Sequence, residues 1–348
     1  MHSYRSNILA RVLLRPLSYL YYIITEIRNY LYTHHLLKIS TFKVPVISIG
    51  NITTGGTGKT PMVICLLQLL KNDYKKIVVV SRGYKRNTTG VQIVSDGKGN
   101  IVSSMTGGDE PVLLARKYPQ YPVLVAERRR KGIEIACARF LPHLIILDDA
   151  FQHRSVHRDC DIVLLNINQD INKDNLLPLG NLREAITNLQ RAHIKIVTGF
   201  NLWEQPAVKD DNVVFKSITR CTGYIKSGNQ LVRNLEILRD KSAIAFCGIA
   251  NPDSFHNLLK SLHVNIREFL AFKDHYRYTR EEFERLTILA RKAGCEFVIT
   301  TEKDLVKWRD MFRIPENLIA LAIEMELEQE ENIRQIIKTH LDLKRIID

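Results

Sequence analysis

The sequence predicts an α/β protein built around a mostly parallel β-sheet. Short apolar runs alternate along the chain with longer stretches of helical periodicity, which is the pattern of strands joined by crossover helices. The apolar runs are nearly continuous, as expected for strands that are covered on both faces. The first such run also leads through a glycine-rich segment into an apolar helical pattern, which makes a strand–loop–helix unit.

Composition indicates a folded chain that is long enough for two domains. Its 348 residues are 45% hydrophobic and 25% charged, which is ordinary for a folded protein and excludes general disorder. The formal net charge of +13 favours a polyanionic partner, namely nucleic acid, a nucleotide or an anionic membrane face, with an inert basic surface as the alternative. The six cysteines include no C-x-x-C pair, so we expect reduced thiols, no disulfide framework and no zinc site.

The N-terminal segment, residues 1–40, is predicted to form an amphipathic, membrane-associated helix. Its longest uninterrupted apolar part, residues 16–25, is about half of the ~20 residues that a membrane-spanning helix needs. No small-residue cleavage site follows it, so it does not resemble a secretory signal. Tyrosine and leucine residues flanked by arginines suit a helix that lies in the membrane interface. The alternative is a helix packed on the protein's own core.

The predicted core domain covers residues 41–172, and a second, smaller α/β domain covers residues 173–348. The boundary is placed where residues 167–184 become rich in Asn, Asp, Pro and Gly, as is typical of loops. The predicted strands are residues 43–51, 76–83, 90–96, 122–126, 143–153, 161–167, 194–199, 213–220, 242–250, 296–308 and 318–326. The predicted helices are residues 61–71, 109–118, 127–140, 252–262 and 278–294, with a charged helix at the end of the chain. Thr279 and Glu282 form a capping-box pattern, and Gly294 is the expected stop of that helix.

The glycine-rich segment NITTGGTGKTP, residues 51–61, is a variant of the phosphate-binding loop G-x-x-x-x-G-K-[ST]. Thr53 stands where the usual spelling has its first glycine, which affects only the entry of the loop. Backbone N–H groups of such a loop wrap the phosphates of ATP, Lys59 neutralises them, and the Thr60 hydroxyl ligates magnesium. The residues expected to bind the nucleotide are Thr53, Thr54, Gly55, Gly56, Thr57, Gly58, Lys59 and Thr60.

Three further segments carry groups suited to acid–base or metal chemistry. In LIILDDAFQH, Asp148 and Asp149 end an apolar strand, which predicts carboxylate ligands for magnesium. In TGGDEP, Asp109 and Glu110 follow a double glycine, a pattern that by itself is most often a helix N-cap. In FKDHYRYT, His275 follows an aspartate; a lone histidine is usually structural, but one next to a carboxylate can orient or polarise a base.

The ordered set of motifs resembles the tetraacyldisaccharide 4'-kinase family, the lipid A 4'-kinases of Gram-negative bacteria. The set comprises SIGNITTGGTGKTP, SRGY, GDEP, LDDAFQH, PLGNLRE, FCGIANP, FKDHYRYT and TTEKD. It covers essentially the whole chain, and the family's loop also lacks the first glycine. The resemblance implies a phosphate-loop NTPase-like core with a smaller α/β domain and an N-terminal membrane-interface helix.

The resemblance also implies an activity: transfer of the γ-phosphate of ATP, with Mg²⁺, to the 4'-hydroxyl of tetraacyldisaccharide 1-phosphate, giving lipid IVA. The expected partners are this lipid disaccharide and the anionic surface of the bacterial inner membrane, at its cytoplasmic face, with no nucleic acid and no obligate protein partner. An interfacial helix and a basic face would hold the active site against the headgroups.

Site residues follow from the same resemblance. Asp109 and His275 would form a catalytic pair, brought together by closure of the two domains, and Lys59 would act on the phosphates. Thr60, Asp148 and Asp149 would hold the metal. The positions expected around the substrate or phosphates are Tyr84, Glu110, Arg129, Gln152 and His153. Ala150 and Tyr276 depart from the family, which commonly carries glycine and a second histidine there.

Two other classes of protein are alternatives to a lipid kinase. A partitioning-type ATPase has a deviant loop that T-G-G-T-G-K-T closely resembles, but Thr54 stands where that class needs its signature lysine. A nucleic-acid-binding ATPase is favoured only by the net charge, and no interleaving of aromatic and basic residues supports it. Both remain distinguishable from a kinase by whether ATP turnover depends on a lipid acceptor.

Overall fold

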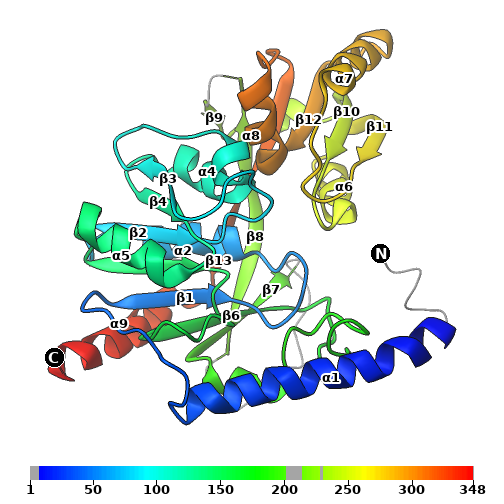
Figure 1. The fold of residues 1–348 in the computed structure, drawn as a ribbon. Coiled ribbons are helices and arrows are strands. Elements are labelled where there is room, and N and C mark those ends of the chain that lie inside the picture. Colours follow the sequence, from blue (N-terminus) through cyan, green and yellow to red (C-terminus); the bar gives the residue numbers. More distant parts are fainter. Residues whose placement is uncertain (1–7, 201–213, 228–229, 348) are drawn as a thin grey trace. The chain divides into compact units, whose positions relative to one another are not determined.

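The computed structural model of the chain describes residues 8–200, 214–227 and 230–347 (Figure 1). It divides into two compact units. The first comprises Met1–Arg82, Arg128–Thr219 and Met325–Asp348, and the second comprises Gly83–Glu127 and Arg220–Glu324. The predicted boundary between residues 172 and 173 does not coincide with any of these divisions. The polar loop that suggested it is packed within the first unit, where the Thr54 N–H donates to the Asn181 carbonyl (2.8 Å).

A parallel sheet forms the centre of the first unit, in the order β7-β6-β1-β5-β2. Its strands are β1 (Val46–Gly50), β2 (Ile77–Ser81), β5 (Leu144–Asp148), β6 (Cys160–Asn166) and β7 (Ile194–Phe200), with the start of β8 (Val214–Ile225) beside β7. The central strand β1 is buried at every position and pairs in parallel with both β5 and β6. The prediction of nearly continuous apolar, parallel strands is therefore confirmed.

Helices pack on this sheet and place the glycine-rich loop. They are α2 (Lys59–Leu70), α5 (Arg129–Phe140) and α9 (Glu330–Ile347), with a short 3₁₀ turn η1 (Ile186–Arg191). Helix α2 packs on β1 and β5, and α9 packs on β6 and on α2. Asp73, which follows α2, accepts from Arg334 of α9 (2.8 and 2.9 Å). The glycine-rich loop therefore lies between two anchored elements. They are β1, which pairs with β5 and β6, and α2, which packs on the sheet and on α9.

Helix α1 (Ile8–Thr33) belongs to the first unit (Figure 1). Its side chains form two different faces. One face is anchored, because Ser18 donates to the Leu176 carbonyl and Tyr21 donates to the Arg183 carbonyl (both 2.8 Å). The other face is exposed and apolar, with a spacing of four and three residues through Leu13, Leu17, Leu20, Ile24 and Ile27. Within the described part of the chain, no helix has the length and apolarity needed to cross a bilayer.

The second unit contains four neighbouring parallel strands, in the order β11-β10-β12-β13. Its strands are β10 (Ser242–Cys247), β11 (Asn265–Ala271), β12 (Phe297–Thr301) and β13 (Leu318–Leu327), with an antiparallel pair β3 (Gln92–Asp96) and β4 (Pro122–Val125), and β9 (Leu231–Val232) paired with β8. Its helices are α3 (Ser104–Gly107), α4 (Asp109–Lys117), α6 (Pro252–Ser261), α7 (Arg280–Lys292) and α8 (Glu302–Met311), with a 3₁₀ turn η2 (Glu236–Leu238). An aromatic cluster of Phe246, Tyr278 and Trp308 fills part of its core.

Two local predictions in the second unit had different outcomes. The capping box is confirmed, since Thr279 accepts from the Glu282 N–H and the Glu282 side chain accepts from the Thr279 N–H. The strand predicted for residues 296–308 is wrong beyond Thr301, where α8 begins at Glu302. The Thr301 hydroxyl accepts from the Asp304 N–H and so caps that helix.

Candidate active site

The phosphate loop joins β1 to α2 in the first unit. Gly58 has φ 83° and is the N-cap of α2, so Lys59 and Thr60 are the first two residues of the helix. The Asn51 amide donates to the Thr57 hydroxyl (3.0 Å), which fixes the loop from its own start. A side chain at Gly58 would bring its Cβ to 2.8 Å from Met325 Cε. The loop therefore places Lys59 at the N-terminus of a helix, the kind of position at which anions bind.

Thr53 explains why the loop does without its first glycine. The residue is buried and forms an antiparallel bridge with Leu182, a partner supplied by the polar loop over residues 174–182. It is absent from the residues with positive φ, whereas Gly55 and Gly58 have φ 110° and 83°. An ordinary side chain thus fits at position 53, and the glycines stand where the backbone needs them.

Asp149 lies beside the cations of the loop. Its Oδ1 is 2.9 Å from Arg183 Nη1 and 3.6 Å from Lys59 Nζ. Burial alone would raise the pKa of the Asp149 carboxyl, but the charges of Lys59 and Arg183 hold it below its usual value. The residue has φ 49°, whereas the neighbouring Ala150 is fully buried and has no positive φ. Alanine in place of the family's glycine is therefore accommodated, because Asp149 takes the left-handed position of the turn.

Asp148 and Thr60 carry oxygen atoms of the kind that magnesium binds. Asp148 ends β5, where its Oδ2 accepts from the Ser81 hydroxyl at the end of β2 (2.8 Å). Thr60 lies in the first turn of α2, which packs on β5. Hydroxyl and carboxylate oxygens are the donors that Mg²⁺ prefers, and it commonly uses only one or two carboxylates together with water and phosphate oxygens. The described residues contain no group of three or more His, Cys, Asp or Glu side chains suited to a metal. Binding of Mg²⁺ through one or two carboxylates, water and phosphate oxygens does not need such a group.

The turn that carries Asp148 and Asp149 is surrounded by three of the predicted substrate residues, which do not line an open space. They are Arg129, Gln152 and His153. The buried Arg129 guanidinium donates to the Asp148 carbonyl (2.8 Å), and Gln152 donates to the Asn51 carbonyl and to Glu184 (both 2.8 Å). His153 Nε2 accepts from the Arg129 N–H (3.3 Å). Burial, followed by the charge of Arg129, lowers the pKa of His153 to about 4, so the ring is neutral at pH 7. The contacts of these three residues brace the turn that carries Asp148 and Asp149.

Asp109 and His275 form a hydrogen-bonded pair in the second unit. Asp109 is the first residue of α4, and its Oδ2 lies 3.0 Å from Nδ1 of His275, which is in the turn between β11 and α7. The side chains are only 16% and 8% exposed, respectively. Because Gly108 is the N-cap, the N-cap interpretation of Asp109 is wrong. Both residues belong to the same compact unit, so the expectation that domain closure joins them is also wrong.

Two lysines that the motif analysis missed complete this cluster. Lys303 Nζ lies 3.0 Å from His275 Nε2, and Lys307 Nζ lies 3.6 Å from Asp109 Oδ2. Both belong to α8, where residues four apart share one face. The available signal was the Thr301–Asp304 capping pattern, which starts this helix directly before the first lysine. Burial alone would raise the pKa of Asp109, but its bond with His275 and the charge of Lys307 hold it below its usual value.

Tyr84 and Glu110 join the same cluster. The Tyr84 ring packs edge-on against His275 with centroids 5.2 Å apart, and the Glu110 carboxylate is 3.1 Å from Lys303 Nζ. Tyr84 remains 57% exposed, so it is available for a ligand. Tyr276, which replaces a common second histidine, donates instead to Glu282 at the start of α7 (2.6 Å). The departure at 276 therefore leaves the Asp109–His275 pair unchanged.

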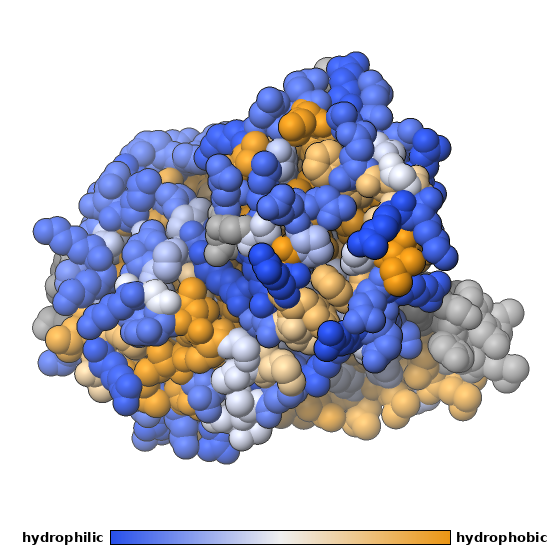
Figure 2. All heavy atoms as spheres, turned by 90° about the horizontal axis from the view of Figure 1, so that it is seen from above, coloured by the Kyte–Doolittle hydropathy of each residue, from blue (hydrophilic) through white to orange (hydrophobic). Residues whose placement is uncertain are grey.

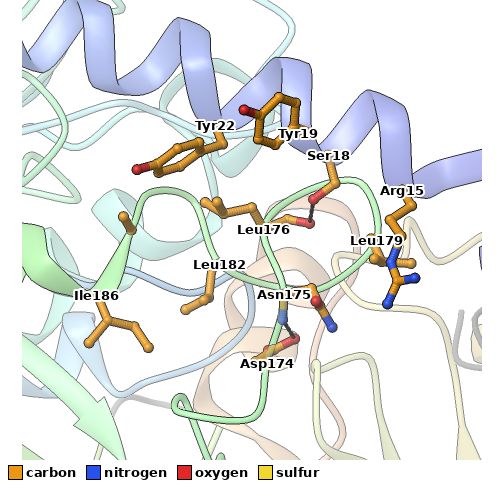
Figure 3. Close-up of a pocket in the computed structure, with 11 residues that line it drawn as sticks. Arg15, Ser18, Tyr19, Tyr22, Asp174, Asn175, Leu176, Leu179, Leu182 and Ile186 are labelled. Carbon is orange, nitrogen blue, oxygen red and sulfur yellow. Dashed lines mark hydrogen bonds between the residues drawn. The ribbon is translucent and has the colours of Figure 1, made fainter.

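A pocket of about 360 Å³ lies in the first unit between α1 and the loop that precedes η1 (Figure 3). Tyr19 and Tyr22 of α1 face Leu176 and Leu182 across it, and Arg15 lies at one end. Leucine and tyrosine side chains make most of its lining apolar. The pocket adjoins the helix whose other face is exposed and apolar.

The strand–loop–helix unit, with Lys59 and Thr60 at the start of α2 and a buried aspartate at the end of the adjacent β5, defines a phosphate-loop nucleotide-binding protein. The sequence profile of the family described as LpxK, Tetraacyldisaccharide-1-P 4'-kinase, matches residues 10–342. The chain belongs to this family.

Similar proteins cover the chain almost completely. A curated Tetraacyldisaccharide 4'-kinase from Aquifex aeolicus (strain VF5) is 39% identical over 327 residues, which are 93% of this chain and 97% of the relative. Another from Syntrophus aciditrophicus (strain SB) is 36% identical over 343 residues, 94% of this chain and 92% of the relative. The crystal structure of the "apo" form of LpxK from Aquifex aeolicus in complex with ATP aligns with a TM-score of 0.81 at 38% identity, covering 95% of this chain and 99% of that one.

Proposed function

We propose that the protein is an ATP-dependent tetraacyldisaccharide 4'-kinase. It transfers the γ-phosphate of ATP to the 4'-hydroxyl of tetraacyldisaccharide 1-phosphate, giving lipid IVA in lipid A biosynthesis. The observation that carries this proposal is the Asp109–His275 pair, with its 3.0 Å hydrogen bond, in a chain that also has the phosphate loop and belongs to this family. A nucleotide switch needs the loop alone, whereas a kinase also needs a group that accepts a proton from its acceptor.

Each cluster has a separate task in this reaction. The loop over residues 53–60 binds the phosphates through backbone N–H groups, and Lys59 moves from Asp149 to the phosphate oxygens. Mg²⁺, held by Thr60 with Asp148 or Asp149, would neutralise charge on the transferred group. Asp109 would accept the proton of the 4'-hydroxyl. Its lowered pKa keeps the carboxylate ionised, and so able to accept a proton, at neutral pH.

Acceptor-dependent turnover is the test of the proposed function. Purified protein with ATP and Mg²⁺ is expected to form the 4'-phosphorylated lipid only when tetraacyldisaccharide 1-phosphate is present, and ATP consumption should match product one to one. Mass spectrometry of the lipid and an ADP assay measure the two quantities. ATP hydrolysis that is independent of the lipid, with no phosphorylated product, would favour the partitioning-type ATPase instead.

The apolar face of α1 supports a peripheral site of action at the inner membrane. Hydrophobic residues gather along this helix, which is the fainter element at the lower right of Figure 2. Apolar side chains at this spacing, on a chain with a net charge of +13, suit a helix that lies in the interface of an anionic membrane. We propose that this face enters the cytoplasmic leaflet and that the pocket beside Tyr19 and Tyr22 takes part of an acyl chain of the acceptor.

Replacing Leu17 and Ile24 together with aspartate is expected to weaken binding to phosphatidylglycerol vesicles at least tenfold. Each side chain is more than half exposed, and burial of one such side chain contributes about 1.5–3 kcal/mol. Vesicle sedimentation measures the effect. Ile288→Asp, at a 50% exposed position of α7, is the matched control and should bind as the unchanged protein does. Equal binding of the double variant would place the membrane contact elsewhere.

A further inference from the structure

We propose that Lys303 is a positioning residue that fixes the tautomer of His275, so that Asp109, His275 and Lys303 act as one hydrogen-bonded chain. This inference rests on the proposed kinase function and assigns a role to the TTEKD segment, which the phosphate loop and the Asp109–His275 pair leave without one. Lys303 touches no reacting atom in this role. It acts through His275.

The contacts of Lys303 hold its ammonium group against the imidazole. Its Nζ lies 3.0 Å from His275 Nε2, 3.1 Å from Glu110 Oε1 and 3.3 Å from Asp274 Oδ1, and the side chain is 17% exposed. Burial alone would lower the pKa of Lys303, but the carboxylates of Glu110 and Asp274 outweigh it and keep the pKa above its usual value. Lys303 therefore stays charged through the neutral range.

A charged ammonium group decides which imidazole nitrogen carries the proton. Lysine has three N–H donors and no acceptor, so His275 Nε2 must accept from it through a lone pair. A neutral imidazole with an unprotonated Nε2 carries its proton on Nδ1. That Nδ1–H then donates to Asp109 Oδ2, 3.0 Å away. A proton on Nε2 would point an N–H at the ammonium group of Lys303. Lys303 therefore disfavours protonation of Nε2.

The same arrangement leaves Asp109 as the base, as in the proposed function. Both nitrogens of His275 are engaged, by Asp109 and by Lys303, so neither is available to take a proton from a hydroxyl group. The remaining acceptor of the chain is the Asp109 carboxylate, which His275 orients. Lys307 has a different task, because it is held by Asp304 (2.9 Å) and lies 3.6 Å from Asp109, where its charge keeps the carboxylate ionised.

Removing the ammonium group makes the charge around His275 more negative. The charged or titratable groups that face the ring are Asp109 and Glu110 of α4, Asp274 of its own turn, Lys303 and Lys307 of α8, and Tyr84. Without Lys303, three carboxylates and one lysine remain, so a proton on Nε2 becomes favourable. The resulting imidazolium would hold Asp109 in a tight ion pair and weaken it as a base. Activity lost in this way returns as the pH rises.

Lys303→Met, which keeps most of the length of the side chain and removes its charge, tests the proposal. We expect kcat at pH 7 to fall roughly 100-fold, within the range for loss of a proton acceptor. The acid limb of the pH–kcat profile should move to higher pH, so the deficit shrinks toward pH 9, while ATP affinity stays unchanged. Lys303→Arg retains a charged donor and should recover most of the activity. Lys292→Met, at an exposed position of α7, is the control and should match the unchanged enzyme.

A double variant separates action through His275 from an independent role. If Lys303 acts through the imidazole, Lys303→Met should cost little in a His275→Ala background, because the two losses are then not additive. Additive losses, or a uniform loss of activity at every pH, would overturn the proposal, since both indicate a role unrelated to the tautomer.

The tautomer itself can be measured without turnover. In protein labelled with ¹⁵N-histidine, the signals that disappear in His275→Gln should report a neutral ring with its proton on Nδ1 at pH 7. A proton on Nε2, or a charged ring, would overturn the proposal even if Lys303→Met fails to fold. The measurement uses no lipid acceptor, so failure of the kinase assay and failure of this inference give separate results.

Discussion

Asp109→Asn is expected to lower kcat by about 10²- to 10⁴-fold, the usual contribution of a positioned base, with ATP affinity unchanged. Asparagine keeps the size of the side chain and an oxygen that can accept from His275 Nδ1 (3.0 Å in this structure). It has no carboxylate to accept a proton from the acceptor hydroxyl. Steady-state kinetics at saturating lipid and calorimetric titration with an ATP analogue measure the two quantities.

The matched control is Asp253→Asn, the same change at an exposed aspartate in the first turn of α6. It should retain full activity. Because the pKa of Asp109 is lowered, the carboxylate loses its function only below its ordinary range near pH 4, so the unchanged enzyme should keep this contribution throughout the neutral range. A kcat for Asp109→Asn close to that of the control would remove Asp109 from the reaction.

The phosphate loop could be predicted because its structure is local. Gly58, Lys59 and Thr60 follow a buried strand and begin a helix, and both features are present in the neighbouring residues. The fit of Thr53 could not be predicted in this way. Its bridge to Leu182 depends on a loop that lies far along the chain and that sequence texture alone presented as a domain boundary.

The acid–base pair shows a different limit. Asp109 after two glycines has the same local pattern as a helix cap, and His275 in a polar turn has the pattern of a structural histidine. They can act as an acid–base pair only when the fold brings them together, and they are 166 positions apart in the sequence. The resemblance to a family supplied the pair, and the structure supplied its geometry.

The two lysines of α8 were missed because of an error in secondary structure. Residues four apart are ~13 Å apart along a strand but only about 6 Å apart on a helix. Interpreted as a continuing strand, Lys303 and Lys307 could not both reach the Asp109–His275 pair. The apolar residues of β12 extended the strand prediction past Thr301, whose hydroxyl in fact begins the helix by accepting from Asp304. A capping residue therefore outweighed the hydrophobic pattern.

Lys59→Met is expected to lower kcat/KM for ATP by about 10²- to 10³-fold, since it removes one charged donor aimed at the transferred phosphate. The fold should persist, because Arg183 at 2.9 Å still compensates Asp149. Kinetics at varied ATP, nucleotide titration and thermal unfolding measure activity, affinity and stability. Lys71→Met, at the C-cap of the same helix, should leave all three unchanged.

Together, Lys59→Met and Asp109→Asn distinguish the tasks of the two clusters. Loss of the lysine should weaken both binding of ATP and transfer, because its charge acts on the phosphates before and during the reaction. Loss of the carboxylate should leave ATP binding intact and reduce only transfer to the lipid. If Lys59→Met instead kept normal ATP affinity and turnover, the nucleotide would have to bind outside the loop, and the assignment of Thr60 and Asp148 to magnesium would fail with it.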